Sequence, residues 1–258
     1  MDDFALSGGS DSDPDQDSDR RRSPGQLDSA RTSAKVLNSI AWPLLLWGLF
    51  APRSHQVVIA ALAVLPMSAI VLAVRSKGLY ELSTMRGAPR PVLSPAFLCG
   101  LVLFIRAIRD ISILPLHWIT ALLAAISVGC ILMMIVVRAD PSTRQGAWAL
   151  ILLVASLYAY GFITEADVLL DWSAPQRIGV AVLGKRYSSG YGKGGMTSYY
   201  LRVSEWGPFI QPNDVPVSHT LYSSASLGQT VCINLFPGAL RIPWYSVVNC
   251  ESNVYREP

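Results

Sequence analysis

The chain has 258 residues, of which 51% are hydrophobic and only 15% are charged, and its formal net charge is +3. Soluble proteins average about 25% charged residues, so this composition excludes an ordinary soluble protein. Charged residues are scarce between residues 36 and 170, whereas both ends of the chain are polar. This profile is typical of a multi-pass membrane protein with a soluble appendage, and neither a nucleic acid nor a nucleotide is expected as a partner.

Residues 1–35 are rich in Ser, Asp, Gly and Pro and almost free of aromatic residues. Such a segment buries too little apolar surface to offset its chain entropy, so we predict a disordered cytoplasmic tail. Five acids alternate from Asp11 to Asp19, but a calcium loop of the EF-hand type needs Gly at its sixth position and Glu at its twelfth. Gln16 and Arg22 stand there instead, so no metal site is predicted.

The middle of the chain, residues 36–170, predicts an α-helical multi-pass membrane domain. A transmembrane helix needs about 20 mostly apolar residues, with about 17 as the usual minimum. The weakest candidate ends on Arg106 and Arg109, whose long side chains could reach the interface and lengthen the span. The sequence predicts about five transmembrane helices, at residues 36–51, 57–74, 92–109, 116–137 and 147–165.

The distribution of Lys and Arg predicts the orientation, because cytoplasmic loops carry an excess of both. With the N-terminus in the cytoplasm, eleven of these residues fall on inner segments and three on outer loops. Five spans then place the C-terminal domain outside, in the periplasm, for a protein of the bacterial inner membrane. The alternative has four spans, with residues 92–105 re-entrant or interfacial, and puts the C-terminal region in the cytoplasm.

The predicted span centres hold no Asp, Glu, Lys, Arg or His, and no motif of a metalloprotease or a serine hydrolase occurs in the chain. Ionisable groups inside a membrane usually mark a transport path or a reaction site. The sequence therefore predicts no catalytic residue, and a protein that is not an enzyme. Polar residues gather only at the helix ends: Arg106, Arg109, Asp110, Glu165, Asp167 and Asp171. If these six residues converge on one cavity, a small transporter or membrane enzyme is favoured. If they point separately into solvent, that alternative fails.

Residues 173–258 predict a small antiparallel all-β domain resembling a barrel. Short segments rich in β-branched and aromatic residues are separated by turn residues, the usual sign of strands. The glycine-rich stretch 192–195 predicts a hairpin turn. Closing the sheet would remove exposed edges. The expected strands cover residues 177–188, 197–207, 230–236 and 244–250.

Gly179, Gly184 and Lys185 have the spacing of a phosphate-binding P-loop, but Arg186 stands where Ser or Thr must hold magnesium. The intervening residues are themselves a strand pattern and no helix pattern follows, so no nucleotide or other cofactor is predicted. Six aromatic residues could form a platform for a sugar or peptide, or alternate ones could fill the barrel core while the rest face the membrane or partner helices. These are Trp172, Tyr199, Tyr200, Trp206, Trp244 and Tyr245.

Cys232 and Cys250 are the only cysteines of this domain and, outside the cytoplasm, lie in an oxidising compartment that favours a disulfide. Direct pairing of the two across a hairpin predicts a wide loop from about Pro237 to Tyr245. A tight turn at the PGAL sequence would instead separate the cysteines by about 13 Å, and a disulfide tolerates only about 7 Å between Cα atoms. The bridge would contribute roughly 3 kcal/mol in the chain-entropy model.

The blocks DWSAPQ, VAVLGKRYSSG, TSYYLRVSEWGP and TVCINLFPGAL-IPWYSVVNC lie within residues 165–250. They resemble the C-terminal end of a group of uncharacterised bacterial multi-pass membrane proteins with the pattern G-D-T-V-C-V-x-L-x-P-G-A-L-G-x-P-W-x-x-V-x-x-C. This chain departs at Gln229, where Asp is usual, and at Arg241, where Gly is usual. The domain is more loosely similar to that of the DUF3592-type membrane proteins, where it lies between helices. Neither group has a known activity that the resemblance could imply.

The sequence as a whole predicts an integral inner-membrane protein with a binding, assembly or sensing role carried by its C-terminal β domain. Its expected partners are the lipid bilayer and a periplasmic or membrane protein. The alternative is a small transporter or membrane enzyme that uses the polar groups at the helix ends.

Overall fold

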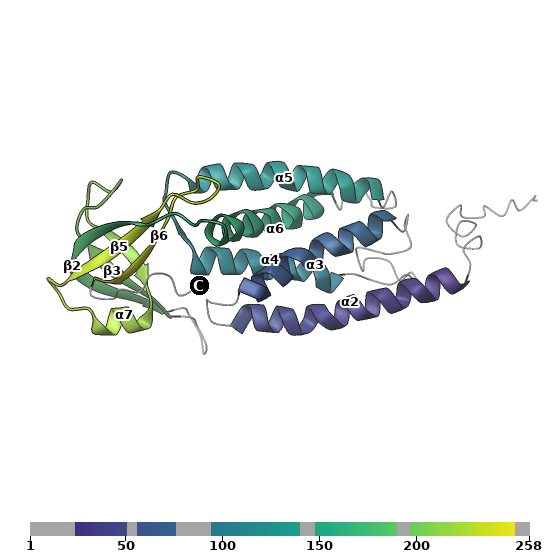
Figure 1. The fold of residues 1–258 in the computed structure, drawn as a ribbon, viewed down its shortest axis with the longest axis horizontal. Helices are drawn as coiled ribbons and strands as arrows, with labels where there is room; N and C mark the ends of the chain where they lie inside the picture. The colour runs from purple at the N-terminus through teal and green to yellow at the C-terminus, as the bar shows by residue number, and fades with distance from the viewer. Residues whose placement is uncertain (1–23, 51–55, 76–93, 140–147, 190–196, 251–258) are drawn as a thin grey trace, which may run out of the picture.

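The computed structural model describes residues 24–50, 56–75, 94–139, 148–189 and 197–250, and the predicted tail up to residue 23 lies outside them. The chain forms a long bundle of helices with a β domain at one end (Figure 1). The bundle comprises α2 (Pro24–Phe50), α3 (Gln56–Arg75), α4 (Ser94–Asp110), α5 (Trp118–Ala139) and α6 (Trp148–Leu169).

The prediction of about five transmembrane helices is wrong, although helices do lie at all five apolar segments. Among the described residues, two helices are long and apolar enough to cross a membrane, Trp118–Arg138 and Trp148–Leu169. The apolar stretch of α3, Gln56–Leu72, is shorter. A crossing needs about 20 apolar residues, and the predicted spans 36–51, 57–74 and 92–109 do not supply helices of that apolar length. The odd number of spans that placed the C-terminal domain outside the cytoplasm therefore has no support from helix length.

The first helix begins earlier than its apolar segment. Helix α2 starts at Pro24, inside the segment 1–35 for which the composition predicts disorder. Proline suits the first turn of a helix, because the N–H that it lacks would have no helical partner there. The residues from Pro24 to Lys35 therefore belong to the same helix as the apolar segment that follows them.

The bundle core is apolar and tightly packed. Leu62 of α3 and Leu103 of α4 are fully buried, and the Tyr158 hydroxyl of α6 donates to the Ala63 carbonyl oxygen at 2.7 Å. At Gly161 of α6 an added Cβ atom would lie only 2.7 Å from the Phe104 nitrogen on α4. Close backbone approach at small residues is common where helices associate in a membrane.

The β domain is an antiparallel sheet with the strand order β1-β6-β5-β2-β3-β4. Strand β2 pairs with β5 along residues 176–181 and with β3 along residues 182–189, with a register shift between Val182 and Gly184. This bend curls the sheet into a nearly closed barrel. The predicted turn at 192–195 lies outside the described residues. The elements are β1 (Ser112–Ile113), β2 (Gln176–Ser189), β3 (Thr197–Val203), β4 (Asn213–Val217), helix α7 (His219–Ser224), β5 (Thr230–Phe236) and β6 (Trp244–Asn249).

Alternating side chains of the strands fill the barrel. Val180 and Val182 of β2 are buried together with Leu201 and Val203 of β3, as expected for residues two apart on one face of a strand. Leu114, from the linker between α4 and α5, belongs to the same core. The barrel therefore takes part of its core, and strand β1, from outside the predicted boundary at residue 173.

Candidate functional site

The β5–β6 loop, residues 237–243, rests against the C-terminal end of α6. The Asp167 side chain accepts the Leu240 backbone N–H at 2.5 Å, and the Asp167 carbonyl oxygen accepts the Ala239 N–H at 3.2 Å. The Asp171 side chain accepts the Gly238 N–H at 3.0 Å and the indole N–H of Trp244 at 3.3 Å. Two carboxylates from one end of α6 thus hold the backbone of this loop. We call this group the loop clasp.

Asp171 is buried, and burial alone would raise its pKa by disfavouring the charged form. Hydrogen bonds from Ser173, Gly238 and Trp244 stabilise the carboxylate and outweigh burial, so the pKa of Asp171 lies below its ordinary value. The Ser173 backbone N–H and hydroxyl both donate to the second carboxylate oxygen, at 2.9 and 2.5 Å. The loop clasp therefore contains a buried anion whose charge is satisfied by donors from the loop and from the following residues.

Two residues of the loop adopt left-handed backbone conformations, Gly238 with φ 75° and Arg241 with φ 63°. At Gly238 an added Cβ atom would lie 2.5 Å from the Ile242 carbonyl oxygen and would also collide with the Asp167 carboxylate. Glycine is needed there both for its φ and for the close approach of α6. Arg241 has a Cβ atom and pays a steric cost for the same region of backbone space.

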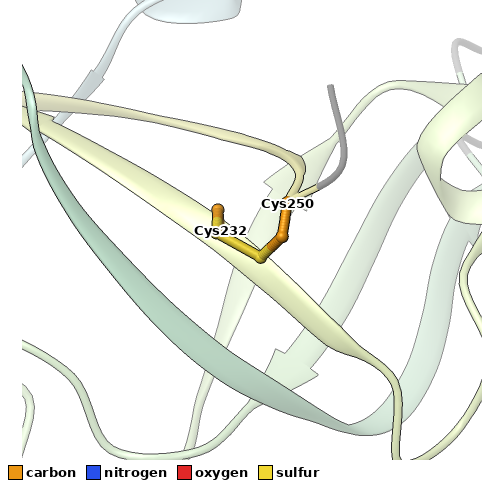
Figure 2. The surroundings of a disulfide bond; sticks show 2 residues. All are labelled: Cys232 and Cys250. Carbon is orange, nitrogen blue, oxygen red and sulfur yellow. A yellow bond between two sulfur atoms is a disulfide. The ribbon is translucent and has the colours of Figure 1, made fainter. Parts of the chain in front are cut away.

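A disulfide closes the other end of the hairpin (Figure 2). The sulfur atoms of Cys232 and Cys250 are bonded, and their Cα atoms lie 4.9 Å apart. The two residues are not directly opposite, since Cys232 pairs with Val248. The wide loop predicted at Pro237–Tyr245 ends at residue 243, because Trp244 already pairs with Phe236. The hairpin is thus held by a covalent bond at one end and by the loop clasp at the other.

The arginines of α4 bind the end of another helix. Arg106 donates from Nη1 to the Gly48 carbonyl oxygen at 3.2 Å, and Arg109 donates to the Leu49 carbonyl oxygen at 3.3 Å. The last carbonyl groups of a helix have no partner within it, so these two cations cap α2 and complement its dipole. Arg106 is also 3.4 Å from the Asp110 carboxylate and is almost fully buried.

Glu165 of α6 is buried and interacts electrostatically with Arg106 and Asp110. The six polar residues at the helix ends therefore form two separate groups. Arg106, Arg109, Asp110 and Glu165 lie at the end of α2, whereas Asp167 and Asp171 hold the β5–β6 loop.

The six aromatic residues serve several purposes. Trp206 is buried in the barrel, with its ring centroid 5.0 Å from that of Tyr245, and its indole N–H donates to Asn213. Trp244 stacks on Phe236 with centroids 4.0 Å apart, next to the loop clasp. Tyr199 packs on His219 and Tyr222, two residues of α7. Tyr200 is partly buried. Trp172 is 84% exposed. They do not form a single platform.

The linker between α4 and α5 also contacts the β5–β6 hairpin, a contact that was not predicted from the sequence. Ser112 and Ile113 pair with Tyr245 and Trp244 of β6, and the Leu114 N–H donates to the Pro243 carbonyl oxygen at 3.1 Å. The alternation of Ile111, Ser112 and Ile113 before Pro115 is a weak strand signal that could have indicated it. The β5–β6 hairpin therefore contacts the helical part through the linker as well as through α6.

Comparison of the whole chain with protein-family models, curated proteins and solved structures finds no match in any of the three. Within the described ranges, no group of three or more His, Cys, Asp and Glu side chains is placed to hold a metal ion. A function can therefore be inferred only from the contacts between the helices and the barrel and from the exposed surfaces of the helices.

Proposed function

We propose that this chain is a membrane-anchored protein in which the helix pair α5–α6 crosses the bilayer and presents the β barrel at one surface, for a binding, assembly or sensing role. One observation carries the proposal. Helices Trp118–Arg138 and Trp148–Leu169 have mean hydropathies of 2.6 and 1.7. In each helix, only 28% of the apolar stretch is buried inside the protein. The core helix of a soluble protein would bury most of such a surface.

The lengths and ends of these helices suit a crossing. At 1.5 Å per residue, a helix of 22 residues is about 33 Å long, close to the roughly 30 Å of the hydrocarbon core. Strand β1 lies just before α5 and strand β2 just after α6, so both connections to the barrel are at the same end of the pair (Figure 1). A helical hairpin with this connectivity keeps the whole barrel on one side of the membrane.

The orientation that we propose places the barrel in the periplasm of a bacterial cell and the opposite end of the bundle in the cytoplasm. Arg138 lies in the last turn of α5, at the end away from the barrel, and Arg144 follows in the sequence. Positive residues favour the cytoplasmic side. The disulfide supports the same orientation, since such bonds persist in oxidising compartments.

The sequence block that resembles the bacterial membrane-protein group coincides with the hairpin and the loop clasp. Its two cysteines form the bridge, Leu240 donates to Asp167 of α6, and Gly238 and Trp244 donate to Asp171, which follows α6. We propose that this block attaches the barrel firmly to the membrane helices. The polar residues at the helix ends bind backbone groups of α2 and of the β5–β6 loop. These contacts hold the fold together, which supports this role over the alternative of a small transporter or membrane enzyme.

The proposal is tested by fusing alkaline phosphatase or a fluorescent protein to the C-terminus and by extracting membranes at alkaline pH. We expect an active phosphatase, a dark fluorescent fusion, and protein that stays in the membrane pellet. Release of the chain by alkaline extraction would refute the crossing, and a bright fluorescent fusion with inactive phosphatase would refute the orientation.

A further inference from the structure

Large apolar side chains are exposed where the helices meet the barrel. Leu116 is 77% exposed, Trp118 49%, Leu170 60%, Trp172 84% and Leu240 53%. They come from three separate segments: the linker before α5, the end of α6 with the following residues, and the β5–β6 loop. We call these five residues the junction rim.

Hydrogen bonds tie the three segments of the junction rim to one another. The linker is joined to the hairpin by the Leu114 N–H and the Pro243 carbonyl, and the loop is joined to α6 by the Leu240 N–H and Asp167. The rim residues therefore lie close to the first turn of α5 and the last turn of α6. They are at the level of the ends of both proposed membrane helices, and not on the far side of the barrel.

Exposed leucine and tryptophan side chains at this level suit the boundary between acyl chains and headgroups. Tryptophan is enriched at both membrane interfaces, because its ring is apolar and its indole N–H can meet polar groups. Trp148, at the other end of α6, is 41% exposed and is placed for the opposite interface. The separation of Trp148 from the rim along α6 matches the thickness of a bilayer.

We infer that the junction rim binds the interfacial region of the lipid bilayer, so that the barrel lies directly on the membrane surface instead of standing clear of it. The inference rests on the proposed crossing by α5 and α6. The barrel end at the β5–β6 loop is then covered by lipid, and a protein partner of the barrel must approach the remaining surface.

Leu227 provides a matched control on the same domain. It is 69% exposed and lies before β5, whose seven residues run about 23 Å towards the loop that carries Leu240. The two leucines are thus similarly exposed at opposite ends of one strand. Only Leu240 should meet lipid.

The experiment uses the full chain with Cys99→Ala and Cys130→Ala, its disulfide kept oxidised, in vesicles of phosphatidylethanolamine and phosphatidylglycerol. Single cysteines carrying a nitroxide label replace Leu240, Leu116 or Leu227 in turn, and Ile126 on α5 as a hydrocarbon reference. Electron paramagnetic resonance measures how collisions with oxygen and with a water-soluble nickel chelate relax each label. We expect oxygen to dominate at residues 240, 116 and 126, and the chelate to dominate at 227.

The outcomes distinguish failure of the inference about the junction rim from failure of the proposed membrane crossing. Chelate-dominated relaxation at both 240 and 116, with residue 126 still in hydrocarbon, would overturn the inference and leave the crossing intact. Water exposure at 126 as well would refute the proposed membrane hairpin itself. Spin–spin broadening at 240 that disappears on dilution with unlabelled protein would show that a second copy, and not lipid, covers the rim.

Discussion

The carboxylate of Asp167 at the end of α6 accepts the backbone N–H of Leu240, a residue 73 positions further along the chain. This bond and those of Asp171 place the β5–β6 loop on the helical bundle.

Replacement of Asp171 by Asn should destabilise the protein at neutral pH. The carboxylate receives four hydrogen bonds, and hydrogen bonds to a charged group contribute about 1.5–3 kcal/mol. We expect a loss of about 2 kcal/mol in the free energy of unfolding, measured by denaturant melts in detergent. Asp214→Asn is the control, since its pair with Arg186 is exposed and should be worth less than about 1 kcal/mol.

Asp171 also predicts a pH dependence. Its pKa in the folded protein is below the ordinary value, so its stabilising effect is full above the unfolded pKa of about 3.9 and is lost as the pH falls through the folded pKa. The wild type should therefore lose stability below about pH 4, and Asp171→Asn should lose less over the same range. Parallel acid curves for the two proteins would contradict this assignment.

Gly238→Ala should be more harmful than Gly228→Ala. Both glycines have positive φ, 75° and 80°. Each alanine should therefore lower the free energy of unfolding by about 1 kcal/mol through backbone conformation alone. Only at Gly238 does the new Cβ atom collide with the Ile242 carbonyl and the Asp167 carboxylate, whereas nothing lies within 4 Å of it at Gly228. Equal losses of thermal stability in the two variants would show that α6 does not press on the loop.

Arg241→Gly should stabilise the protein. The backbone of Arg241 has φ 63°, where a residue with a Cβ atom costs roughly 1–2 kcal/mol, although glycine also gains entropy in the unfolded chain. We expect a net gain of a few tenths to about 1 kcal/mol in unfolding free energy. Arg241→Ala removes the same charge and keeps the strain, so it should give no gain.

Removal of the Cys232–Cys250 bridge should lower the stability by about 3 kcal/mol, since the bond closes a loop across 18 positions. The double variant Cys232→Ala/Cys250→Ala should melt at a lower temperature than the wild type and should be insensitive to reductant. Cys130→Ala should keep the wild-type response to reductant, because Cys130 is a free thiol. Mass spectrometry that finds residues 232 and 250 as free thiols in protein from native membranes would contradict the bridge.

The positions of the helices could be predicted from the sequence, because a run of apolar residues is a local property. The number of helices long and apolar enough to cross a membrane could not be predicted, since three of the five runs fall near the minimum length of about 17 residues. The six polar residues at the helix ends could be identified from the sequence, but their division into two groups could not. It depends on partners from distant segments, such as the Gly48 carbonyl group for Arg106 and the Gly238 N–H for Asp171.

The hairpin shows the same limit in a smaller region. The disulfide could be predicted from the number of cysteines and the expected compartment. The pairing of Cys232 with Val248 and the bonds of the loop to Asp167 and Asp171 could not. Strand β1 has two residues, and its partner β6 is more than a hundred residues away. The residues around it give a weak strand signal, but nothing in them indicates β6 as the partner.

Strand β1 sets an order of events in the synthesis of this protein. Ser112 and Ile113 leave the ribosome before α5, whereas their neighbour in the sheet, β6, is made only after β5. The edge of the barrel must therefore remain open until β6 has been made. In a chain truncated before Trp244, Leu114 would lack the hairpin that covers it.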